Sequence, residues 1–599
     1  MAAEEKITLL NGRLFYQIFI SGANKILENQ KLLNQINVFP VPDSDTGTNL
    51  ASTFRAVIDN ARPDNSFKVT ADAIAIAALN GARGNSGVIF AQFLYGVSRE
   101  VGNDSNLTIE GFANAISRSV DYMYKAVAVP VEGTMLTVIR EWAEFIYNSR
   151  ERIDDFKNLF KHSYDIALTS LADTTKKLKV LSLANVVDAG AKGFVLFLEG
   201  LIDGLRKTVL HEEIIASHAD IELSGLEHIE HGDFNFRYCS EALIRSSNID
   251  HTALSNTVKN MGDSLVIAGS EKMVRLHIHT DHPHILFEKL REFGNISYQK
   301  ADDMKKQHEA VYHRKYKIAL VTDSTCDLPQ EIFEEYQIHM IPLNIHFGET
   351  QYLDKITIQP DQFFRLVETD KQFPSTSQPN EVSFANLYSH LASNYDSIIA
   401  VHLSGRFSGT LKSSQNAATR ISREMGKKIS VINSHHVSGS LGLLTFRIAQ
   451  AIKDGMNHDD IVIMAETWRQ KAKIFVSVKS LKNMIRGGRV SKMKGFIGNL
   501  LNMKPIVSLD DEGGSVLFDK AFSQKRNMKK VMQHIQNFLG QNTVREYFIL
   551  HADAPDNADL FLSGMEKLTG KPPLSVINIS PVVGLHAGKG TVAIALMAE

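Results

Sequence analysis

The sequence predicts a multidomain chain with an all-helical N-terminal domain, a small α+β middle domain and a C-terminal α/β domain. The chain has 599 residues, and ordinary domain sizes divide such a length into about three to five units. Apolar residues recur at helical spacing up to about Leu205, and then alternate with polar ones. After Lys317, short apolar strands alternate with helical stretches, which is typical of α/β units.

The first two domains differ in the period of their apolar residues. Ala71, Ile74, Ala77 and Ala78 show the helical spacing expected of residues 1–205. In residues 206–300, strand alternation returns in segments such as 234–245 and 274–279. We therefore expect an all-helical bundle followed by a small α+β domain.

A charged segment separates these domains from the C-terminal one. Residues 301–314 are rich in Asp, Lys, Glu and His, and we expect a flexible linker there. From residue 315 to 599, strands such as 398–401 and 429–432 alternate with helices and predict parallel pairing. Asp327 is expected to cap a helix that begins at Leu328.

Composition limits the classes of partner. The chain is 44% hydrophobic and 22% charged with a net charge of -2, so nothing in its charge favours nucleic acid. Its two cysteines, Cys239 and Cys326, cannot form a disulfide framework. No window has the roughly 18 uncharged apolar residues that a membrane span needs. We expect a cytoplasmic protein with no membrane span and no nucleic-acid partner.

An Asp-x-Asp loop is the main candidate for phosphate chemistry. Asp43 and Asp45 lie between prolines and a glycine, so both carboxylates can bind one hard cation such as Mg²⁺. The alternative is a capped turn with solvated carboxylates. An EF-hand is disfavoured, because Phe54 falls where a bidentate carboxylate is required.

Two more small-residue loops occur in the same domain. Residues 80–87 precede an apolar helix, and residues 188–193 open the last helix of the domain. Amides at a helix N-terminus can face an anion, although a plain helix start is the alternative for each loop. The sequence Gly588-Lys589-Gly590-Thr591 lacks the spacing of a Walker motif and is not a phosphate loop.

The middle domain contains a candidate zinc site. Strand alternation puts His277 and His279 on one face, and Cys239 is the nearest thiol in sequence. These three side chains, with water or a carboxylate, could complete a tetrahedron around Zn²⁺. Surface histidines, or histidines satisfied within the strand, are the alternative.

The C-terminal domain offers hydroxyls and cations suited to a carboxylate. They lie in four segments, residues 375–378, 404–410, 486–489 and 581–586. Charge-assisted donors bind an acid only if they converge, and otherwise each segment is an ordinary turn. Apolar lining could come from Phe496, Ile497, Leu500, Leu501 and Met503, which could equally be plain core.

Residues 37–49, Asn37-Val38-Phe39-Pro40-Val41-Pro42-Asp43-Ser44-Asp45-Thr46-Gly47-Thr48-Asn49, together with 83–87, resemble the DhaL-type domain of dihydroxyacetone kinases and bacterial fatty acid kinase. The resemblance covers about residues 1–205 and implies a helical barrel in which Asp43 and Asp45 hold Mg²⁺ on the phosphates of ATP. The nucleotide-binding residues it implies are Asn37, Thr46, Gly47, Thr48, Asn49, Ser86, Gly87 and Gly190. Asn37 replaces a third Asp of dihydroxyacetone kinases, and Ser44 replaces a usual Gly.

The other two domains also resemble known families. Residues 238–241 with 275–281 are similar to the middle domain of fatty acid kinase, which implies that Cys239, His277 and His279 form a metal site. Residues 321–328, 376–379 and 487–489 resemble a DegV-type fatty-acid-binding protein over nearly all of residues 315–599. The carboxylate-binding residues this implies are Thr376, Ser377, Ser404, Gly405, Ser408, Arg489 and His586. Leu411 and Lys589 depart from that family's usual Tyr and Pro.

These resemblances together imply a fatty acid kinase fused to its fatty-acid-binding partner. The expected reaction converts a fatty acid and ATP into an acyl phosphate, with Mg²⁺ and, in the middle domain, Zn²⁺. The expected catalytic residues are Asp43, Asp45, Arg489 and His586. A homodimer and a downstream acyltransferase are the expected protein partners. The alternatives are a lipid carrier or sensor with an inactive kinase half, and a kinase of the dihydroxyacetone type.

Overall fold

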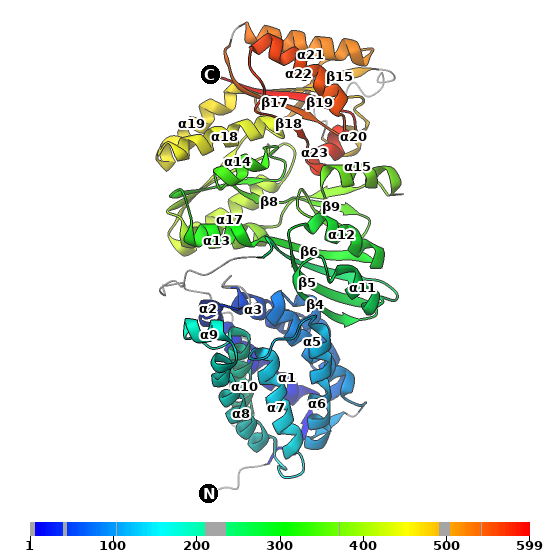
Figure 1. Cartoon of the computed structure of the whole chain (residues 1–599), viewed down its shortest axis with the longest axis vertical. Helices are drawn as coiled ribbons and strands as arrows, with labels where there is room; N and C mark the ends of the chain where they lie inside the picture. The colour runs from blue at the N-terminus through cyan, green and yellow to red at the C-terminus, as the bar shows by residue number, and fades with distance from the viewer. Residues whose placement is uncertain are drawn as a thin grey trace. The chain divides into compact units, whose positions relative to one another are not determined.

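The computed structural model describes residues 6–39, 45–103, 105–209, 235–370, 372–489, 503–540 and 542–599. They form two compact units, Met1–Lys305 and Lys306–Glu599, shown in Figure 1. Asp43 and Ser44 lie outside the described residues, as do Phe496, Ile497, Leu500 and Leu501. Within the described ranges, no helix has both the length and the apolar character that a membrane crossing needs.

The first part of unit 1 is helical, as expected. Its elements are β1 (Leu9–Asn11), α1 (Gly12–Glu28), α2 (Gln30–Gln35), α3 (Thr46–Asn60), α4 (Phe67–Gly81), α5 (Gly84–Glu100), β2 (Asn106–Thr108), α6 (Ile109–Ala126), α7 (Met135–Ser149), α8 (Phe156–Lys177), α9 (Lys179–Ala184) and α10 (Ala189–Val209). Side chains of Asn11, Ser66, Thr108 and Asp155 cap four of the helices by accepting backbone N–H bonds.

Aromatic side chains fill the centre of this helical domain. Phe54, Phe90 and Phe197 lie with their ring centroids 5.0 to 5.3 Å apart. Helices α1 and α10 approach closely because glycines face each other, and a Cβ added at Gly200 would lie 2.6 Å from Gly22 Cα. The three rings belong to α3, α5 and α10, so this core packs these helices against one another.

The middle domain completes unit 1 with an antiparallel sheet of order β4-β5-β3-β6. Its elements are β3 (Tyr238–Arg245), α11 (His251–Val258), β4 (Asp263–Ser270), β5 (Met273–Thr280), α12 (Pro283–Leu290), the 3₁₀ turn η1 (Arg291–Phe293) and β6 (Asn295–Asp303). Val266 and Ala268 of β4 belong to the same apolar core as the helices. The Gly269 N–H also donates to Gln92 Oε1 at 2.8 Å, so this sheet packs directly on α5.

The segment expected to be a flexible linker has regular structure instead. Residues 301–303 complete β6, and α13 (Met304–Tyr312) follows at once. Ala310 of α13 is buried in an apolar cluster of unit 2. The charged residues that suggested a linker are thus the polar positions of a strand end and a helix, and the expectation of a structureless linker is wrong.

Unit 2 is an α/β domain, as expected. Its strands are β7 (Ile318–Asp323), β8 (His339–Ile341), β9 (Asn344–Phe347), β10 (Thr350–Leu353), β11 (Ser375–Ser377), β12 (Ser397–His402), β13 (Lys428–Asn433), β14 (Ala472–Ser477), β15 (Lys504–Leu509), β16 (Ser515–Ala521), β17 (Val544–His551), β18 (Ser575–Asn578) and β19 (Val592–Ala598). Its helices are α14 (Gln330–Glu335), α15 (Pro360–Thr369), α16 (Glu381–Asn394), α17 (Thr410–Met425), α18 (Gly439–Lys453), α19 (His458–Lys471), α20 (Lys482–Arg486), α21 (Gln524–Leu539), α22 (Pro555–Thr569) and α23 (Pro581–Ala587).

Three sheets organise unit 2. The sheet β13-β12-β7-β8 is parallel, which confirms the expected pairing of residues 398–401 and 429–432. The sheet β16-β15-β14-β19-β17-β18 is mixed, because only β17 and β18 pair in parallel. A small antiparallel sheet, β10-β9-β11, completes the unit. Strands of the six-stranded sheet supply part of the apolar wall of a cavity described below.

Candidate nucleotide, metal and acyl sites

The predicted nucleotide loops converge at one pocket of unit 1. Its described lining combines the chain around α3, the start of α5 and the middle-domain sheet, and consists of Asn37, Phe39, Asp45, Thr46, Asn49, Gly84, Asn85, Ser86, Cys239, His277 and His279. The start of α10 lies beside this pocket, since a Cβ added at Gly190 would come within 2.9 Å of Ser86 Oγ. The three loops, far apart in sequence, therefore meet.

Asp45 occupies the N-cap of α3, but its side chain makes no capping hydrogen bond. Its backbone carbonyl accepts the Asn49 N–H at 2.8 Å, so the helix fixes the backbone and leaves the carboxylate to the pocket. The buried Oδ1 of Asn85 has no hydrogen-bond partner within the described chain. An unsatisfied buried acceptor beside a carboxylate suits a cation.

Other predicted nucleotide residues support the loops from behind the pocket. Thr48 Oγ1 accepts hydrogen bonds from the Gln30 and Asn34 amides at 3.1 and 3.0 Å. Gly47 lies against the backbone of Gln30, where an added Cβ would come within 2.0 Å of the carbonyl oxygen. Thr48, Gly47, Gly87 and Gly190 are not among the described lining residues.

Cys239, His277 and His279 form the expected cluster and belong to the same pocket. One potential ligand atom from each lies within 4.8 Å of the others, and the residues are 2% to 5% exposed. The strand register explains this, because Cys239 on β3 is paired with His279 on β5. Asp263 Oδ1 lies 3.3 Å from His279 Nδ1, as outer carboxylates do when they orient metal-binding histidines.

Burial favours the neutral forms of two members of the cluster, Cys239 and His277. Burial raises the pKa of the Cys239 thiol well above its usual range. Burial also lowers the pKa of His277, whose Nε2 is buried without a partner in the described chain. Zn²⁺ fits these residues, since it accepts one sulfur and two nitrogen ligands at such spacing and leaves a further position open.

Four charged residues on the same face of this sheet were not predicted from the sequence. Glu241 on β3 is paired with His277 on one side and with Lys300 of β6 on the other. Lys300 Nζ lies 2.7 Å from Asp302 Oδ2, and Arg275 is buried against Glu241. Their period-two positions could be seen in the sequence, but only the cross-strand register shows that they lie beside the nucleotide loops.

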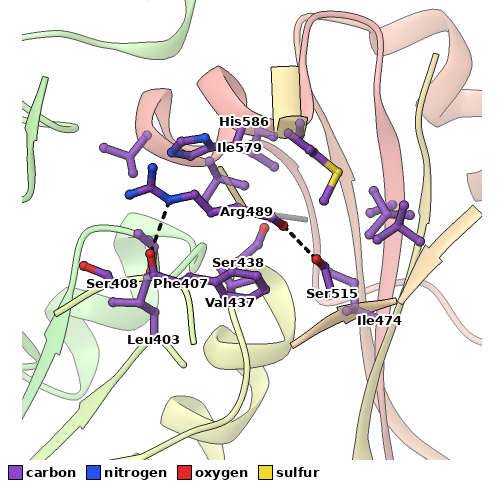
Figure 2. Close-up of a pocket in the computed structure, with 18 of the residues that line it drawn as sticks. Leu403, Phe407, Ser408, Val437, Ser438, Ile474, Arg489, Ser515, Ile579 and His586 are labelled. Carbon is purple, nitrogen blue, oxygen red and sulfur yellow. Dashed lines mark hydrogen bonds between the residues drawn. The ribbon is translucent and has the colours of Figure 1, made fainter. Parts of the chain in front are cut away.

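Unit 2 contains a cavity of about 510 Å³ between its sheets. Apolar residues of β14, β15, β17, β19 and α23 supply most of its wall, including Ile474, Val476, Val507, Leu550, Val582 and Ala593. Figure 2 shows Arg489 and His586 close together, with Leu403, Val437 and Ile474 elsewhere on the wall. Among the described residues, the lining of the cavity is thus mostly apolar, with Arg489 as its one Lys or Arg side chain.

Predicted residues gather around this cationic group. Arg489 Nε donates to the Phe407 carbonyl at 3.3 Å, which orients the guanidinium. Thr376 Oγ1 lies 3.4 Å from His586 Nε2. Burial, with Arg489 nearby, lowers the pKa of His586 to about 4, so this imidazole is neutral at physiological pH and Arg489 carries the charge.

The structure brings together most, but not all, of the predicted acid-binding residues. Thr376, Ser377, Ser408, Arg489 and His586 line the cavity. Ser404 and Gly405 do not, because the fully buried Ser404 accepts the Arg406 N–H and the Gly405 N–H turns toward Asn433. Sequence reasoning did not select Thr325, Ser438 and His551, which also line it.

Asp327 does not cap the following helix as expected. Its carboxylate accepts hydrogen bonds from Ser438 Oγ at 2.6 Å and from the Ser580 N–H at 3.0 Å, and pairs with Lys355 at 2.8 Å. The N-cap position of α14 is Pro329 instead. Asp327 therefore connects the segments around Lys355, Ser438 and Ser580, which are distant in sequence.

Three family models match successive parts of the chain. A DAK2 domain model matches residues 40–203, and a model of the FakA-like middle domain of fatty acid kinase matches residues 235–311. A model of the uncharacterised DegV family matches residues 317–599.

Two relatives of the chain are named only as uncharacterized proteins. One from Staphylococcus epidermidis is 32% identical over 324 residues, and one from Staphylococcus aureus is 31% identical over 324 residues. Each alignment covers 52% of this chain, and the chain spans 58% of the length of each relative.

Among solved structures, a DegV family protein of Thermus thermophilus, described as fatty acid binding, is 27% identical with a TM-score of 0.44, covering 47% of this chain and 100% of that one. DegV of Bacillus subtilis, a fatty acid binding protein, is 29% identical with a TM-score of 0.44, covering 48% and 100%. On the family models, the chain combines a DAK2 domain, a FakA-like middle domain and a DegV domain in one polypeptide.

Proposed function

We propose that this chain is a fatty acid kinase, which transfers the γ-phosphate of ATP to the carboxylate of a fatty acid and produces an acyl phosphate. The main support is the apolar cavity with Arg489 in its wall, present in the same chain as the pocket at which the three predicted nucleotide loops converge. A long apolar acid needs such an apolar cavity, and a phosphate donor needs such a nucleotide pocket.

The nucleotide pocket suits magnesium and phosphate. Asp45 and the buried Asn85 Oδ1 are oxygen donors of the kind that Mg²⁺ prefers, and we propose that Asp43 adds a second carboxylate. Bound there, Mg²⁺ would neutralise phosphate charge. The helix starts at Thr46 and Gly84 would direct backbone amides toward the phosphates. Asn37, Thr46, Asn49 and Ser86 would contact the nucleotide directly.

We also propose a Zn²⁺ site at Cys239, His277 and His279. Their mutual spacing and burial support it. Bound zinc would add positive charge to the wall of the nucleotide pocket, because these three residues line that pocket. Asp263 would hold the His279 ring in the orientation that metal binding requires.

The acid is proposed to bind with its carboxylate at Arg489 and its chain along the apolar wall. A charge-assisted hydrogen bond from Arg489 is the strongest interaction available there. Neutral His586 and the hydroxyls of Thr376, Ser377 and Ser408 would add further hydrogen bonds. The six apolar wall residues named above would exclude water from the acyl chain.

The chemical step needs positioning more than acid-base help. A carboxylate oxygen of the fatty acid attacks the γ-phosphorus and forms the new P–O bond. The bond from that phosphorus to the β,γ-bridging oxygen breaks, and its electron pair leaves with ADP. The attacking carboxylate is already ionised, so no general base is required, and the rate depends on alignment and charge stabilisation.

Further parts of the proposal concern location and partners. An acyl phosphate is an activated acyl donor, so an acyltransferase is the class of enzyme that would consume it. ATP as substrate and two free, buried cysteines suit the cytoplasm. We propose a homodimer, because the donor and acceptor pockets belong to residues of different units and transfer could then pass between chains.

Fatty-acid-dependent release of ADP tests the proposal against its rivals. Purified protein with Mg-ATP should release ADP faster when oleate or palmitate is added, and dihydroxyacetone should have no effect. Stimulation by dihydroxyacetone alone would identify a small-molecule kinase. Tight binding of fatty acid with no binding of ATP would identify a lipid carrier.

A further inference from the structure

A buried ion pair joins the middle-domain sheet to the start of α5. Glu241 Oε1 accepts a hydrogen bond from the Gly84 backbone N–H at 2.8 Å. The other oxygen, Oε2, accepts one from Arg275 Nη2 at 2.7 Å. The side chains of Glu241 and Arg275 are 0% and 1% exposed. Such a pair is costly to bury, so each partner depends on the other.

Gly84 is a sensitive point for this contact. Its φ of +57° lies in the left-handed region, and an added Cβ would lie 2.1 Å from Asn49 Nδ2. Helix α5 begins at Gly84, and the next two residues, Asn85 and Ser86, line the nucleotide pocket. A small backbone rotation at Gly84 would therefore change the orientation of both Asn85 and Ser86 in the pocket.

The positively charged neighbour of Glu241 makes its buried carboxylate tolerable at the N-terminus of α5. A carboxylate there normally competes with a bound phosphate for the same amides. Glu241 takes only the Gly84 amide, and its charge is balanced by Arg275. The amides of Asn85 and Ser86 stay available to a ligand.

We propose that Glu241 is a positioning residue for the nucleotide, holding the first turn of α5 against the middle-domain sheet so that Asn85 and Ser86 face the phosphates. The middle domain then contributes to ATP binding through a residue that does not itself line the pocket. This inference rests on the proposed nucleotide site.

Two substitutions at one position separate this role from general stability. Glu241→Ala removes the acceptor for Gly84, whereas Glu241→Gln keeps an acceptor and removes the charge. Asp303→Asn is the matched control, because it removes one charge from another ion pair of the same domain, that of Asp303 with Arg237 at 2.5 Å. Affinity for Mg-ATP is measured by calorimetry, affinity for a fluorescent fatty acid by titration, and amide hydrogen exchange over residues 83–90 by mass spectrometry.

We expect Glu241→Ala to weaken Mg-ATP binding by about tenfold or more, the effect of one buried hydrogen bond lost. Amides of residues 83–87 should exchange faster, and fatty acid affinity should not change. Glu241→Gln should recover most of the ATP affinity. Asp303→Asn should leave it within about twofold of the wild type.

Two results would overturn the inference while leaving the kinase proposal intact. One is a Glu241→Ala protein that binds Mg-ATP, and protects residues 83–87, as the wild type does. The other is an equal loss of affinity in the Ala and Gln variants, which would assign the effect to the Arg275 ion pair. A wild type that binds no Mg-ATP would overturn both the proposed function and this role.

If Glu241→Ala fails to fold, the Glu241→Gln variant decides the question alone. Wild-type ATP affinity in this variant supports the inference, and a tenfold or greater loss of affinity refutes it.

Discussion

At the scale of single residues, the proposed acid site combines the charge of Arg489 with several neutral groups. Arg489 supplies the positive charge in the wall of the unit 2 cavity, whereas burial keeps His586 neutral. The two residues therefore differ in what they offer a carboxylate, although both were expected to be catalytic. Their separate variants should have effects of different size.

Substitution of Arg489 should weaken fatty acid binding more than substitution of His586. Arg489→Gln removes a charge-assisted hydrogen bond, so we expect a loss of about 10- to 100-fold. His586→Gln replaces one neutral donor or acceptor by another, and we expect less than about tenfold. Titration with a fluorescent fatty acid measures both, with Lys589→Gln as control, since Lys589 pairs with Glu368 and does not line the cavity. Equal losses for Arg489 and His586 would show that His586 is charged.

The depressed pKa of His586 predicts a pH dependence of stability. An unfolded chain binds the proton near pH 6.5, and the folded chain only near pH 4. Above pH 6.5 His586 is neutral in both states, and its ionisation does not affect stability. As the pH falls from 6.5 toward 4, protonation favours the unfolded chain, and stability decreases by up to about 1.4 kcal/mol per pH unit. Chemical unfolding at pH 7 and pH 5 should show a smaller drop for His586→Gln than for the wild type. Parallel drops in the two proteins would mean that the histidine is not buried as described.

At the scale of elements, helix starts and strand registers build the sites. The glycine-rich loops were predictable, because positive φ values and close approaches at helix starts need glycine, as at Gly84. The position of the charged residues of the middle-domain sheet beside these loops was not predictable. It depends on which residues of β3, β5 and β6 are opposite one another, and alternation alone cannot fix that register. Ser404 and Ser408 could not be distinguished from the sequence, because only packing decides which of the two side chains lines the cavity.

Alanine substitutions at two glycines with similar positive φ angles separate the effect of a steric clash from the effect of the left-handed backbone conformation. Gly84 and Gly426 have φ values of +57° and +64°, but a Cβ at Gly426 meets no atom within 4 Å. Gly426→Ala should cost about 1 kcal/mol of folding stability from the left-handed backbone alone. Gly84→Ala should cost more, because it also displaces Asn49, and should weaken Mg-ATP binding. Denaturant unfolding and calorimetry check both variants, and equal stability losses with unchanged ATP affinity would contradict the close packing at Gly84.

At the scale of the whole molecule, the three-part division was predictable from changes in apolar period, and the family models match the same three parts. The expected linker was wrong, because charged residues in a strand end and an amphipathic helix resemble a linker when their burial is unknown. Because the proposed nucleotide pocket and the proposed acid-binding cavity belong to different units, the route of the proposed phosphate transfer is the main question at this scale.

Complementation between two defective chains tests that route. A heterodimer of Asp45→Ala and Arg489→Ala chains, isolated with two different tags, keeps one intact nucleotide pocket and one intact cavity on different chains. If transfer passes between the chains of a homodimer, we expect about half of the wild-type rate, because one of the two site pairs survives. The control heterodimer, wild type with an Asp45→Ala/Arg489→Ala chain, should then be inactive. The opposite pattern would establish transfer within one chain.

Direct capture of the product tests the central claim. Purified protein is incubated with Mg-ATP, hydroxylamine and a panel of fatty acids, and the fatty hydroxamate formed from an acyl phosphate is measured by mass spectrometry. The proposed function predicts hydroxamate in proportion to ADP for at least one fatty acid, and none with Asp45→Ala or Arg489→Ala. ADP formation without hydroxamate, or no turnover with any acid, would contradict it.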